Sequence, residues 1–372
     1  MKLNNIYGCC ALRIGFKITV IVLLLVTGAS AAEITVCKTG ICDYSTIQAA
    51  ISAASPGDII MVHSGTYYEN VDVNQPLILK GIDTGGGKPV VLDFIGGPRI
   101  TLSAGNSTFE GFSLRGMPGV INVNSNNNII RNDDTCSIDL ESSNNNMLAD
   151  NVATCSWTAI ILDSSSNNIL FNNTAESVND WGISLHSSSN NNTLSWNKVV
   201  GVVSGIELSS ASNNTLSWNT VTGIAGPGIE LTSSGYNTLN GNKVSRFSST
   251  SSTISISLSS SSNNIIYNND FSGTARDNGY NKWNITKTYG ENIIGGSWLG
   301  GNFWSDYAGK DTDGDGLGNT LLPYNSSGDI TNGGDYLPVV VATIPPSPAP
   351  ELPTIALMGI GIFGLMFIKR GK

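Results

Sequence analysis

The sequence contains little charge and very few histidines. Asp, Glu, Lys and Arg make up 13% of its 372 residues, with 28 acidic and 19 basic side chains, and there are two histidines. The formal net charge is −9, and no cluster of Lys and Arg offsets it. Binding to nucleic acid through its phosphates is therefore excluded, because such binding depends on grouped positive charge.

Helix-forming sequence is also scarce. Asn, Ser, Thr and Gly abound, and their side chains or backbones favour turns over helices. Apolar residues still make up 40% of the chain, and they follow a strict pattern. The composition therefore predicts a folded chain with many turns.

Long apolar runs occur at the two ends. The run "ITVIVLLLV" follows basic residues and precedes the small residues of "GASAAE", which predicts a secretory signal peptide over residues 1–32. An uncleaved membrane anchor is the alternative. Residues 341–353 form a Pro-rich linker, and residues 354–372 hold a second apolar run with a basic end. This run is shorter than the roughly 20 residues that span a bilayer comfortably, so it is read as an anchor or a sorting signal.

The middle of the chain repeats itself every ~22 residues. Segments such as "GIELSSA" and "GIELTSS" place an Ile two residues before a Leu, a strand pattern with one buried face. The Ile column is Ile138, Ile160, Ile183, Ile206, Ile229 and Ile256, and the Leu column is Leu140, Leu162, Leu185, Leu208, Leu231 and Leu258.

Each repeat holds three short strands separated by Asn, Ser and Gly turns. Three strands in so few residues predict one triangular coil of a solenoid, with coils stacked ~4.8 Å apart. The fold class is therefore all-β, a single-stranded right-handed parallel β-helix of nine or ten coils over residues 71–290. A helical or leucine-rich repeat is disfavoured by the period-two pairs and the scarcity of helix formers.

One cysteine pair tests this register. Cys136 and Cys155 each lie four residues after an asparagine, Asn132 and Asn151. We therefore expect them at the same point of adjacent coils, with Cα atoms ~4.8 Å apart, a separation that suits a disulfide.

The N-terminal segment 33–70 has another pattern. Cys37 and Cys42 frame "CKTGIC" and are expected to close a small disulfide loop, as suits an exported chain. Ser45 is expected to cap a short helix that covers the first coil. The apolar face of that helix comprises Ile47, Ala50, Ile51 and Ala54.

The motif "STIQAAISAASPGDIIMVHSGTYYENV…LILKG" resembles the opening of pectin-lyase-like right-handed β-helix proteins. The coils resemble the carbohydrate-binding and sugar-hydrolase (CASH) repeats and the NosD-like family that shares them. The resemblance spans residues 43–340. "GGNFWSDY…DTDGDGLGN…PY…GGDYLP" resembles the closing segment of NosD-like proteins, which implies a C-terminal cap over residues 291–340.

The C-terminal order "PELPTIAL…GLMFI…KRGK" resembles the archaeal PEF-CTERM sorting signal, with Leu352 where that pattern has Phe. This resemblance implies that an archaeosortase-type enzyme cuts near Pro350 and Glu351 and attaches the protein to a surface lipid. A retained membrane segment would equally place the body outside the cell. Both alternatives predict a protein anchored at the cell surface.

Polar residues beside the Ile and Leu columns share one outward face. The candidate ligand-binding residues on it are Asp139, Glu141, Asp163, His186, Glu207 and Glu230. Stacked carboxylates repel unless a proton, a cation or a ligand lies between them. The face is read as a solvated surface, a carbohydrate or cation site, or a catalytic face whose carboxyl spacing would suit a glycosidase. No catalytic motif of the family can be matched, so no catalytic residue is assigned.

Acidic residues past the coils suggest a structural calcium site. Asp311, Asp313 and Asp315 precede Gly316, the order found in the first half of an EF-hand loop. The bidentate Glu of an EF-hand is missing, and Asn319, Asp329 or Asp335 is a candidate to complete the site. A ligand-free acidic turn is the alternative.

Two further features are read from the repeats. Trp196 and Trp218 occupy the same place in "TLSWN" and are expected to stack, either shielding a corner or binding a sugar ring. Six sequons are glycosylation candidates in predicted turns or tails: Asn106, Asn172, Asn191, Asn213, Asn284 and Asn325.

The leading prediction is an exported, surface-anchored archaeal protein with a structural or carbohydrate-binding role in the envelope. The alternative is a polysaccharide lyase or glycoside hydrolase of the pectin-lyase fold. The NosD resemblance implies a second alternative, copper handling for nitrous-oxide reductase maturation. The histidine and cysteine ligands that copper prefers are few in this sequence. The only histidines are His63 and His186, and the cysteines of the body are expected to be paired.

Overall fold

The structure is a computed structural model that describes residues 31–92, 99–116, 119–246 and 254–341. The predicted signal peptide up to residue 30, and the linker and C-terminal segment from residue 342 onward, lie outside the described residues. Among the helical segments that are described, none has the length and hydropathy of a membrane span. The described residues from Ala32 onward belong to one compact unit.

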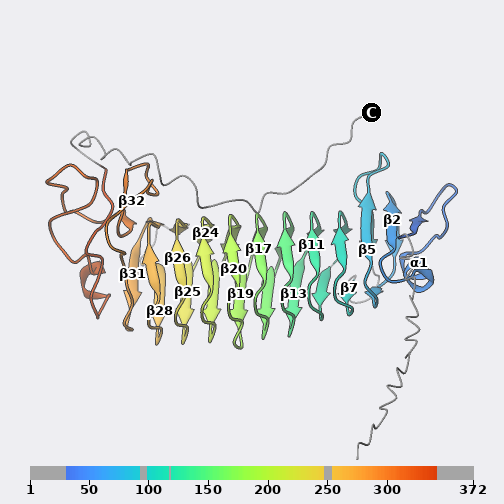
Figure 1. The fold of residues 1–372 in the computed structure, drawn as a ribbon, viewed down its shortest axis with the longest axis horizontal. Helices are drawn as coiled ribbons and strands as arrows, with labels where there is room; N and C mark the ends of the chain where they lie inside the picture. Colours follow the sequence, from blue (N-terminus) through green and yellow to red (C-terminus); the bar gives the residue numbers. More distant parts are fainter. Residues whose placement is uncertain (1–30, 93–98, 117–118, 247–253, 342–372) are drawn as a thin grey trace, which may run out of the picture. The chain divides into compact units, whose positions relative to one another are not determined.

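This unit is a parallel β-solenoid of about ten turns (Figure 1). Each turn contributes one strand to each of three parallel sheets, as predicted. The coils repeat about every 23 residues, because Ile160 pairs with Ile183 and Ile183 pairs with Ile206. Crossovers between parallel strands of one sheet are right-handed, so the fold is the predicted right-handed parallel β-helix.

The three sheets are named A, B and C here. Sheet A comprises β1 (Glu33–Val36), β2 (Ile59–His63), β5 (Ile78–Ile82), β8 (Thr108–Glu110), β11 (Ile129–Arg131), β14 (Met147–Ala149), β17 (Ile169–Phe171), β20 (Thr193–Ser195), β23 (Thr215–Ser217), β26 (Thr238–Asn240) and β29 (Ile265–Tyr267). Sheet B comprises β3 (Thr66–Tyr68), β6 (Val90–Leu92), β9 (Ser113–Leu114), β12 (Asp134–Thr135), β15 (Val152–Cys155), β18 (Thr174–Ser177), β21 (Lys198–Gly201), β24 (Thr220–Gly223), β27 (Lys243–Arg246), β30 (Asp270–Phe271) and β34 (Phe303–Trp304). Sheet C comprises β4 (Val71–Val73), β7 (Arg99–Leu102), β10 (Val120–Val123), β13 (Ser137–Glu141), β16 (Ile160–Asp163), β19 (Ile183–His186), β22 (Ile206–Ser209), β25 (Ile229–Thr232), β28 (Ile254–Ser259) and β31 (Thr274–Asp277).

The predicted Ile and Leu columns form the core along sheet C. All six Ile residues are fully buried, and the six Leu residues are at most 2% exposed. Their register follows the predicted alignment from coil to coil, with Ile206 opposite Ile229 and Leu208 opposite Leu231. Burying each such side chain contributes about 1.5–3 kcal/mol relative to exposure.

Buried asparagines form two ladders at the corners of the coils. At the corner between sheets A and B, Asn197 Nδ2 donates to Oδ1 of Asn219 over 2.9 Å and to the carbonyl of Leu170 over 2.9 Å. The backbone N–H of Asn197 donates to the same Oδ1. Each amide thus joins neighbouring coils through both of its ends. The full ladder is Asp133, Asn151, Asn173, Asn197, Asn219, Asn242, Asn269, Asn302 and Asp335.

The ladder corrects one step of the predicted register. The backbone N–H of Asp133 donates to Oδ1 of Asn151. Asn151 is therefore equivalent to Asp133 and not to Asn132. The disulfide between Cys136 and Cys155 is nevertheless formed, with Cα atoms 4.5 Å apart. The one-residue offset is accommodated because both cysteines lie where the chain turns from sheet B into sheet C.

The N-terminal helix is present as α1 (Ile47–Ala53). Ser45 does not cap it, because Thr46 is the N-cap residue and makes no side-chain cap bond. Instead the carboxylate of Glu69 accepts from the first two helical amides over 2.9 Å each. The apolar face is buried as predicted, at Ile47, Ala50 and Ile51.

The segment past the last coil contains an antiparallel pair and aromatic packing. Strands β32 (Thr288–Tyr289) and β33 (Trp298–Leu299) pair antiparallel, and a 3-10 turn, η1, covers Ser326–Gly328. Trp304 stacks on Phe271 of the last coil and on Tyr324, with ring centroids 4.7 Å and 4.5 Å apart. These rings continue the core past the last asparagine rung.

Candidate ligand-binding surfaces

The six predicted residues of the acidic face all lie on sheet C, on the strands β13 to β25. The register brings three pairs together: Glu207 opposite Glu230, Glu141 opposite Asp163, and Asp163 opposite His186. Asp139 lies opposite Ile161 and has no acidic partner in the next coil. The predicted residues therefore share one sheet, where Glu141, Asp163 and His186 follow one another in adjacent coils and Glu207 and Glu230 form a second group.

The Glu207–Glu230 pair is held by serine hydroxyls. Ser184 Oγ donates to Oε2 of Glu207, and Ser204 Oγ donates to Oε2 of Glu230, each over 2.7 Å. Burial raises the pKa of Glu207, the Ser184 hydroxyl opposes this, and the charge of Glu230 raises it further. Glu207 is therefore more readily protonated than an exposed glutamate.

A shallow hollow of about 440 Å³ lies beside Glu207. Two of the predicted residues, His186 and Glu207, line it. Asp180 and Trp181, from the loop that leads into β19, also line it, and sequence reasoning missed Asp180. The buried Nε1 of Trp181 has no hydrogen-bond partner among the described residues.

The remaining acids are closely tied to neighbours. Asp163 lies 3.5 Å from Nδ1 of His186, a contact that is an ion pair only when the imidazole is protonated. Asp139 accepts from the Ser137 hydroxyl. Burial raises the pKa of Asp139, and the hydroxyl and the charge of Arg99 oppose this.

A second surface lies at the opposite corner, between sheets A and B. The rings of Trp196 and Trp218 stack as predicted, with centroids 5.6 Å apart and planes 11° from parallel. They are 57% and 38% exposed, so both rings are accessible from solvent. A Cβ on Gly241, in the next coil, would lie 2.8 Å from the ring of Trp218. The missing side chain therefore leaves space for that ring.

Both tryptophans have strained backbones. Their φ angles are +59° and +57°, in the left-handed region where a bulky residue costs about 1–2 kcal/mol. The equivalent residue of the other coils is Asn, Asp or Gly, which tolerate that region: Asn132, Asp150, Asn172, Gly241 and Asn268. In the alignment of the repeats, these two turn positions hold Trp where the other coils have Asn, Asp or Gly. This difference is the sequence signal that would have identified Trp196 and Trp218 as candidate functional residues.

The outer face of sheet A continues this surface. Leu194 and Leu216 are fully buried, so the residues on either side of each point outward. They are hydroxyl residues on β20 and β23: Thr193, Ser195, Thr215 and Ser217. Phe171 lies opposite Ser195 and is 40% exposed. At the far corner of the sheet, Tyr236 is 65% exposed and also has positive φ, +59°.

The predicted calcium loop brings its three aspartates together. Ligand atoms of Asp311, Asp313 and Asp315 all lie within 4.8 Å of one another. Lys287 forms an ion pair with Asp315 and lies 4.6 Å above the ring of Trp298. The loop carboxylates are thus partly neutralised by a lysine.

Of the three residues suggested to complete the loop, Asp329 and Asp335 do not group with these aspartates, whereas Asn319 contacts the loop at Thr312. Oδ1 of Asn319 accepts from the backbone and hydroxyl of Thr312 over 2.7 and 3.0 Å. Asp329 lies 4.0 Å from Arg276, and Asp335 accepts from Trp304 at the end of the asparagine ladder.

The predicted sequons lie largely on the surface. Five of the six asparagines are exposed: Asn106, Asn172, Asn191, Asn213 and Asn325. Asn284 is half-buried, and its side chain is hydrogen-bonded to the backbone of Ile285 and Tyr336.

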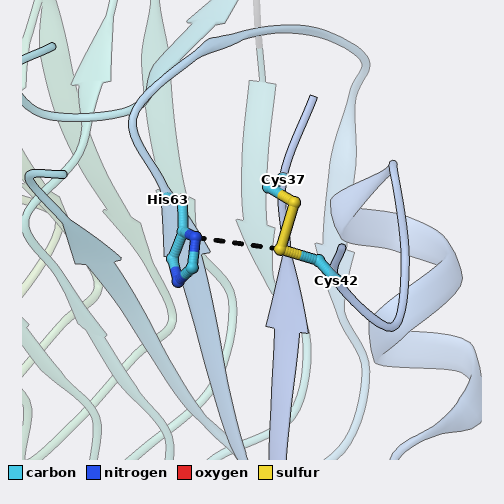
Figure 2. Close-up of side chains that lie close together, drawn as sticks. All are labelled: Cys37, Cys42 and His63. Atoms are coloured by element: carbon cyan, nitrogen blue, oxygen red, sulfur yellow. Dashed lines mark hydrogen bonds between the residues drawn. A yellow bond between two sulfur atoms is a disulfide. The ribbon is translucent and has the colours of Figure 1, made fainter. Parts of the chain in front are cut away.

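The second predicted disulfide, between Cys37 and Cys42, is also formed. The Sγ atom of Cys42 lies 3.7 Å from Nδ1 of His63, as Figure 2 shows. Two disulfides are consistent with an oxidising compartment outside the cytoplasm.

Comparisons with known proteins identify a family and a fold. A family model described as "Periplasmic copper-binding protein (NosD)" matches residues 53–201 and 115–309. No curated protein sequence matches the chain.

Several solved structures resemble the solenoid. The enzymatically active domain of bacteriophage CBA120 tailspike protein 2 is 13% identical with a TM-score of 0.52, over 68% of this chain and 46% of that one. The A-module of Azotobacter vinelandii mannuronan C-5 epimerase AlgE4 is 15% identical with a TM-score of 0.48, over 63% of this chain and 90% of that one. The catalytic domain of Agl-KA is 14% identical with a TM-score of 0.45, over 68% and 57%. At these identities the likeness concerns the fold alone.

Proposed function

The chain belongs to the NosD family, and on this premise we propose that it is an extracytoplasmic β-helix protein that binds a polysaccharide along the outer face of sheet A. The single observation that carries the proposal is the stacked pair of Trp196 and Trp218 at left-handed positions. Strained, exposed aromatic residues persist where function compensates for their cost in stability.

The chemistry of the surface suits a sugar chain. The apolar faces of sugar rings pack on indole rings, which supply large contact area at low entropy cost. Trp196 is the more exposed of the two rings. The stack runs from Gly241 through Trp218 to Trp196, which forms its exposed end. The hydroxyls of Ser195 and Ser217 lie beside it and can exchange hydrogen bonds with sugar hydroxyls.

The repeat also suits a polymer better than a single sugar. Strands of sheet A lie about 4.7–4.9 Å apart, and β20 and β23 present the same residues, Thr, Leu and Ser, in register. A chain with a similar monomer repeat would meet the same groups on successive coils.

The experiment is a glycan array on the purified full-length protein, followed by titration of each bound glycan. We expect Trp196→Ala and Trp218→Ala to weaken binding by about tenfold or more, as for aromatic anchors at interfaces. Trp157→Ala is the matched control, because Trp157 is 54% exposed on a different loop. Equal binding by all three variants would exclude the Trp surface.

A second candidate function is polysaccharide cleavage at the hollow beside Glu207. The observation that favours it is the convergence of Asp180, Glu207 and His186 on one hollow, together with the raised pKa of Glu207. A carboxyl that holds its proton at higher pH can act as a general acid. Release of new reducing ends or unsaturated products, lost in Glu207→Gln, would support cleavage. Binding without products would leave the protein a binding module.

The sequence pattern supports attachment to the cell surface. The Pro-rich linker and the C-terminal apolar run follow the body in the order of a sorting signal. We propose that this end anchors the protein at the outer face of the membrane, by cleavage and lipid attachment or as a retained segment. Mass spectrometry of the C-terminal peptide from cells distinguishes the two, and a freely secreted full-length chain would contradict both.

A further inference from the structure

Two exposed tyrosines line a hollow at the C-terminal end of sheet A. Tyr236, just before β26, is 65% exposed, and Tyr280, which follows β31, is 74% exposed. Both line a hollow of about 500 Å³, together with Asn263, Ile265 and Lys282. Ile265 begins β29, and Lys282 forms a parallel β-bridge with it. The hollow therefore continues the outer face of sheet A past its last complete coil.

The two tyrosines occupy one turn column of the repeats. At the corner between sheets C and A, the N–H of Asn237 donates to Oδ1 of Asn264, and the N–H of Asn264 donates to Oδ1 of Asn281. The residues immediately before these three asparagines are, in successive coils, Tyr236, Asn263 and Tyr280. The tyrosines therefore stand on either side of Asn263, two strand spacings or about 9.4–9.8 Å apart along the solenoid. The space between them is called the tyrosine slot here.

Tyr236 is an exception in this column. Its φ is +59°, in the left-handed region that bulky residues rarely adopt. The described residues that share a positive φ in this column are otherwise asparagines, which tolerate it: Asn106, Asn127, Asn145, Asn167, Asn191, Asn213 and Asn263. Tyr236 thus repeats, at the opposite corner of the sheet, the strained and exposed aromatic residue seen at Trp196 and Trp218. Strain of this kind persists where function compensates for it.

We propose that the tyrosine slot is a second sugar subsite, which holds one uncharged unit of the polysaccharide proposed above. The inference rests on that proposed function and adds a second point of contact and a ligand class. Carbon contacts of about 3.5–4.0 Å on both faces of a sugar ring place two enclosing aromatic rings about 7–8 Å apart. This separation fits within the spacing of Tyr236 and Tyr280. Asn263 is exposed between them, and its amide can exchange hydrogen bonds with sugar hydroxyls.

One glycan can reach the tyrosine slot and the tryptophan pair together. Tyr236 precedes β26 and Gly241 follows it, and a Cβ on Gly241 would meet the ring of Trp218. The short separation in sequence limits the backbone positions of Tyr236 and Gly241 to at most about 18 Å. A glycan that runs across β26 therefore meets aromatic rings at both corners of the sheet.

The path between the two subsites has no charged side chain. The outward residues of β20 and β23 are the hydroxyl residues described above, and those of β26 and β29 are Thr238, Asn240, Ile265 and Tyr267. An acidic polysaccharide would place its anionic groups over strands that supply no cation, on a chain with a formal net charge of −9. Lys282, beside the tyrosine slot, can donate to a hydroxyl oxygen. The surface therefore favours an uncharged glycan.

The test is calorimetric titration of the purified full-length protein with defined hexasaccharides. The uncharged probes are hexasaccharides of glucose, mannose and xylose, and the acidic probes are hexasaccharides of mannuronic and galacturonic acid. We expect at least one uncharged probe to bind, and each acidic probe to bind at least about tenfold more weakly. Equal or tighter binding of an acidic probe would overturn the ligand class. Binding of no probe would overturn the subsite together with the proposed function.

Two substitutions examine the tyrosine slot itself. Tyr236→Asn and Tyr280→Asn each introduce the residue that other coils have in this column, so the fold should be kept, which urea unfolding checks. Each should weaken binding of the uncharged probe by about tenfold or more, as for aromatic anchors at interfaces. Tyr68→Asn is the matched control, because Tyr68 is 54% exposed on β3 of sheet B, and it should leave binding unchanged.

The outcomes separate the tyrosine slot from the tryptophan surface. Weaker binding in Trp196→Ala with unchanged binding in both tyrosine variants would overturn the slot and leave the proposed function in place. Weaker binding in both tyrosine variants with unchanged binding in Trp196→Ala would support the slot and contradict the tryptophan surface. Weaker binding in only one tyrosine variant would contradict the enclosure of a sugar ring between Tyr236 and Tyr280.

Discussion

The indole rings of Trp196 and Trp218 lie nearly parallel, one coil apart, on two residues whose backbones both have positive φ. Each residue stands where other coils have Asn, Asp or Gly. The two residues therefore lower the stability of the fold locally and expose a large aromatic area. Substitutions can separate the effect on stability from the effect on binding.

Backbone strain at Trp196 should be visible when two truncations are compared. Trp196→Asn and Trp196→Ala both remove the ring, but Asn tolerates the left-handed region better than Ala. We expect the Asn variant to be more stable by about 1 kcal/mol in urea unfolding, while both lose glycan binding equally. Equal stability of the two variants would show that φ at this position is relaxed without the ring.

The register of sheet C predicts opposite tolerance at neighbouring positions. Ile206 is fully buried and Glu207 points outward. Ile206→Ala should cost about 2–5 kcal/mol, and Ile206→Asp should unfold the coil, since it buries an unpaired charge. Glu207→Ser should change the free energy of unfolding by less than about 1 kcal/mol. Similar losses from Ile206→Ala and Glu207→Ser would contradict the register.

Replacing Asp133 with Asn, the residue that occupies most other positions of its ladder, should increase the stability of the protein. Oδ2 of Asp133 is buried and has no hydrogen-bond partner among the described residues, and burial raises the pKa of this carboxyl well above the usual range. At the same place in the next coil, Asn151 Nδ2 donates to the carbonyl of Ile130. Asp133→Asn should therefore stabilise the protein by about 1–3 kcal/mol, and more at pH 8 than at pH 5.

The reverse change is its matched control. Asn151→Asp removes a donor and places a carboxyl in a fully formed rung, so the free energy of unfolding should fall by a similar amount. Destabilisation by both changes would mean that Asp133 has a donor that the ladder does not supply.

The other end of the ladder should make stability depend on pH. Burial raises the pKa of Asp335 to about 7, although the N–H groups of Asn302, Trp304 and Leu337 oppose this. A carboxyl whose pKa rises on folding holds its proton more tightly in the folded state. Its contribution is therefore complete below about pH 4 and is lost as the pH rises through about 7.

The expected loss from Asp335 is on the order of 4 kcal/mol between pH 4 and pH 8, measured by urea unfolding at several pH values. Asp335→Asn should match the wild type at acid pH and show a smaller decline. An identical pH profile in the variant would assign the decline to other carboxyls.

Calcium should stabilise the C-terminal segment if the aspartate loop binds it, as we propose. Addition of Ca²⁺ should raise the melting temperature by several degrees, and EGTA should reverse the change. Asp313→Asn should reduce the shift, because Asp313 is the exposed member of the cluster. Lys287→Met should increase it, because the ammonium group competes for Asp315. No shift in the wild type would leave the loop an acidic turn held by Lys287.

The fold could be predicted from the sequence because, in a solenoid, residues at equivalent positions of successive repeats contact one another. Ile206 and Ile229 are neighbours in space because they are equivalent in successive repeats, so alignment of the copies predicts the pairing directly. The disulfide between Cys136 and Cys155 followed from the same reasoning, although Asn132 was aligned in place of Asp133.

The candidate sites were less predictable because they depend on contacts outside the repeat. Asp180 reaches the hollow from a loop whose course no periodicity describes. Glu69 caps α1 from a different segment, so a search for a capping residue beside the helix selected Ser45. The contact of His63 with Cys42 joins a strand end to a loop 21 residues away, and only the folded chain brings them together.

The asparagine ladder has a consequence for how such a molecule changes over generations. Asn173 receives from one neighbour the same bonds that it gives to the other, and so does Asn219. A duplicated or deleted coil therefore creates no new kind of junction, and tandem duplication within the gene can lengthen the protein by one strand spacing at a time. The two aspartates that end the ladder need never move, so selection can adjust the reach of the molecule without redesigning its ends.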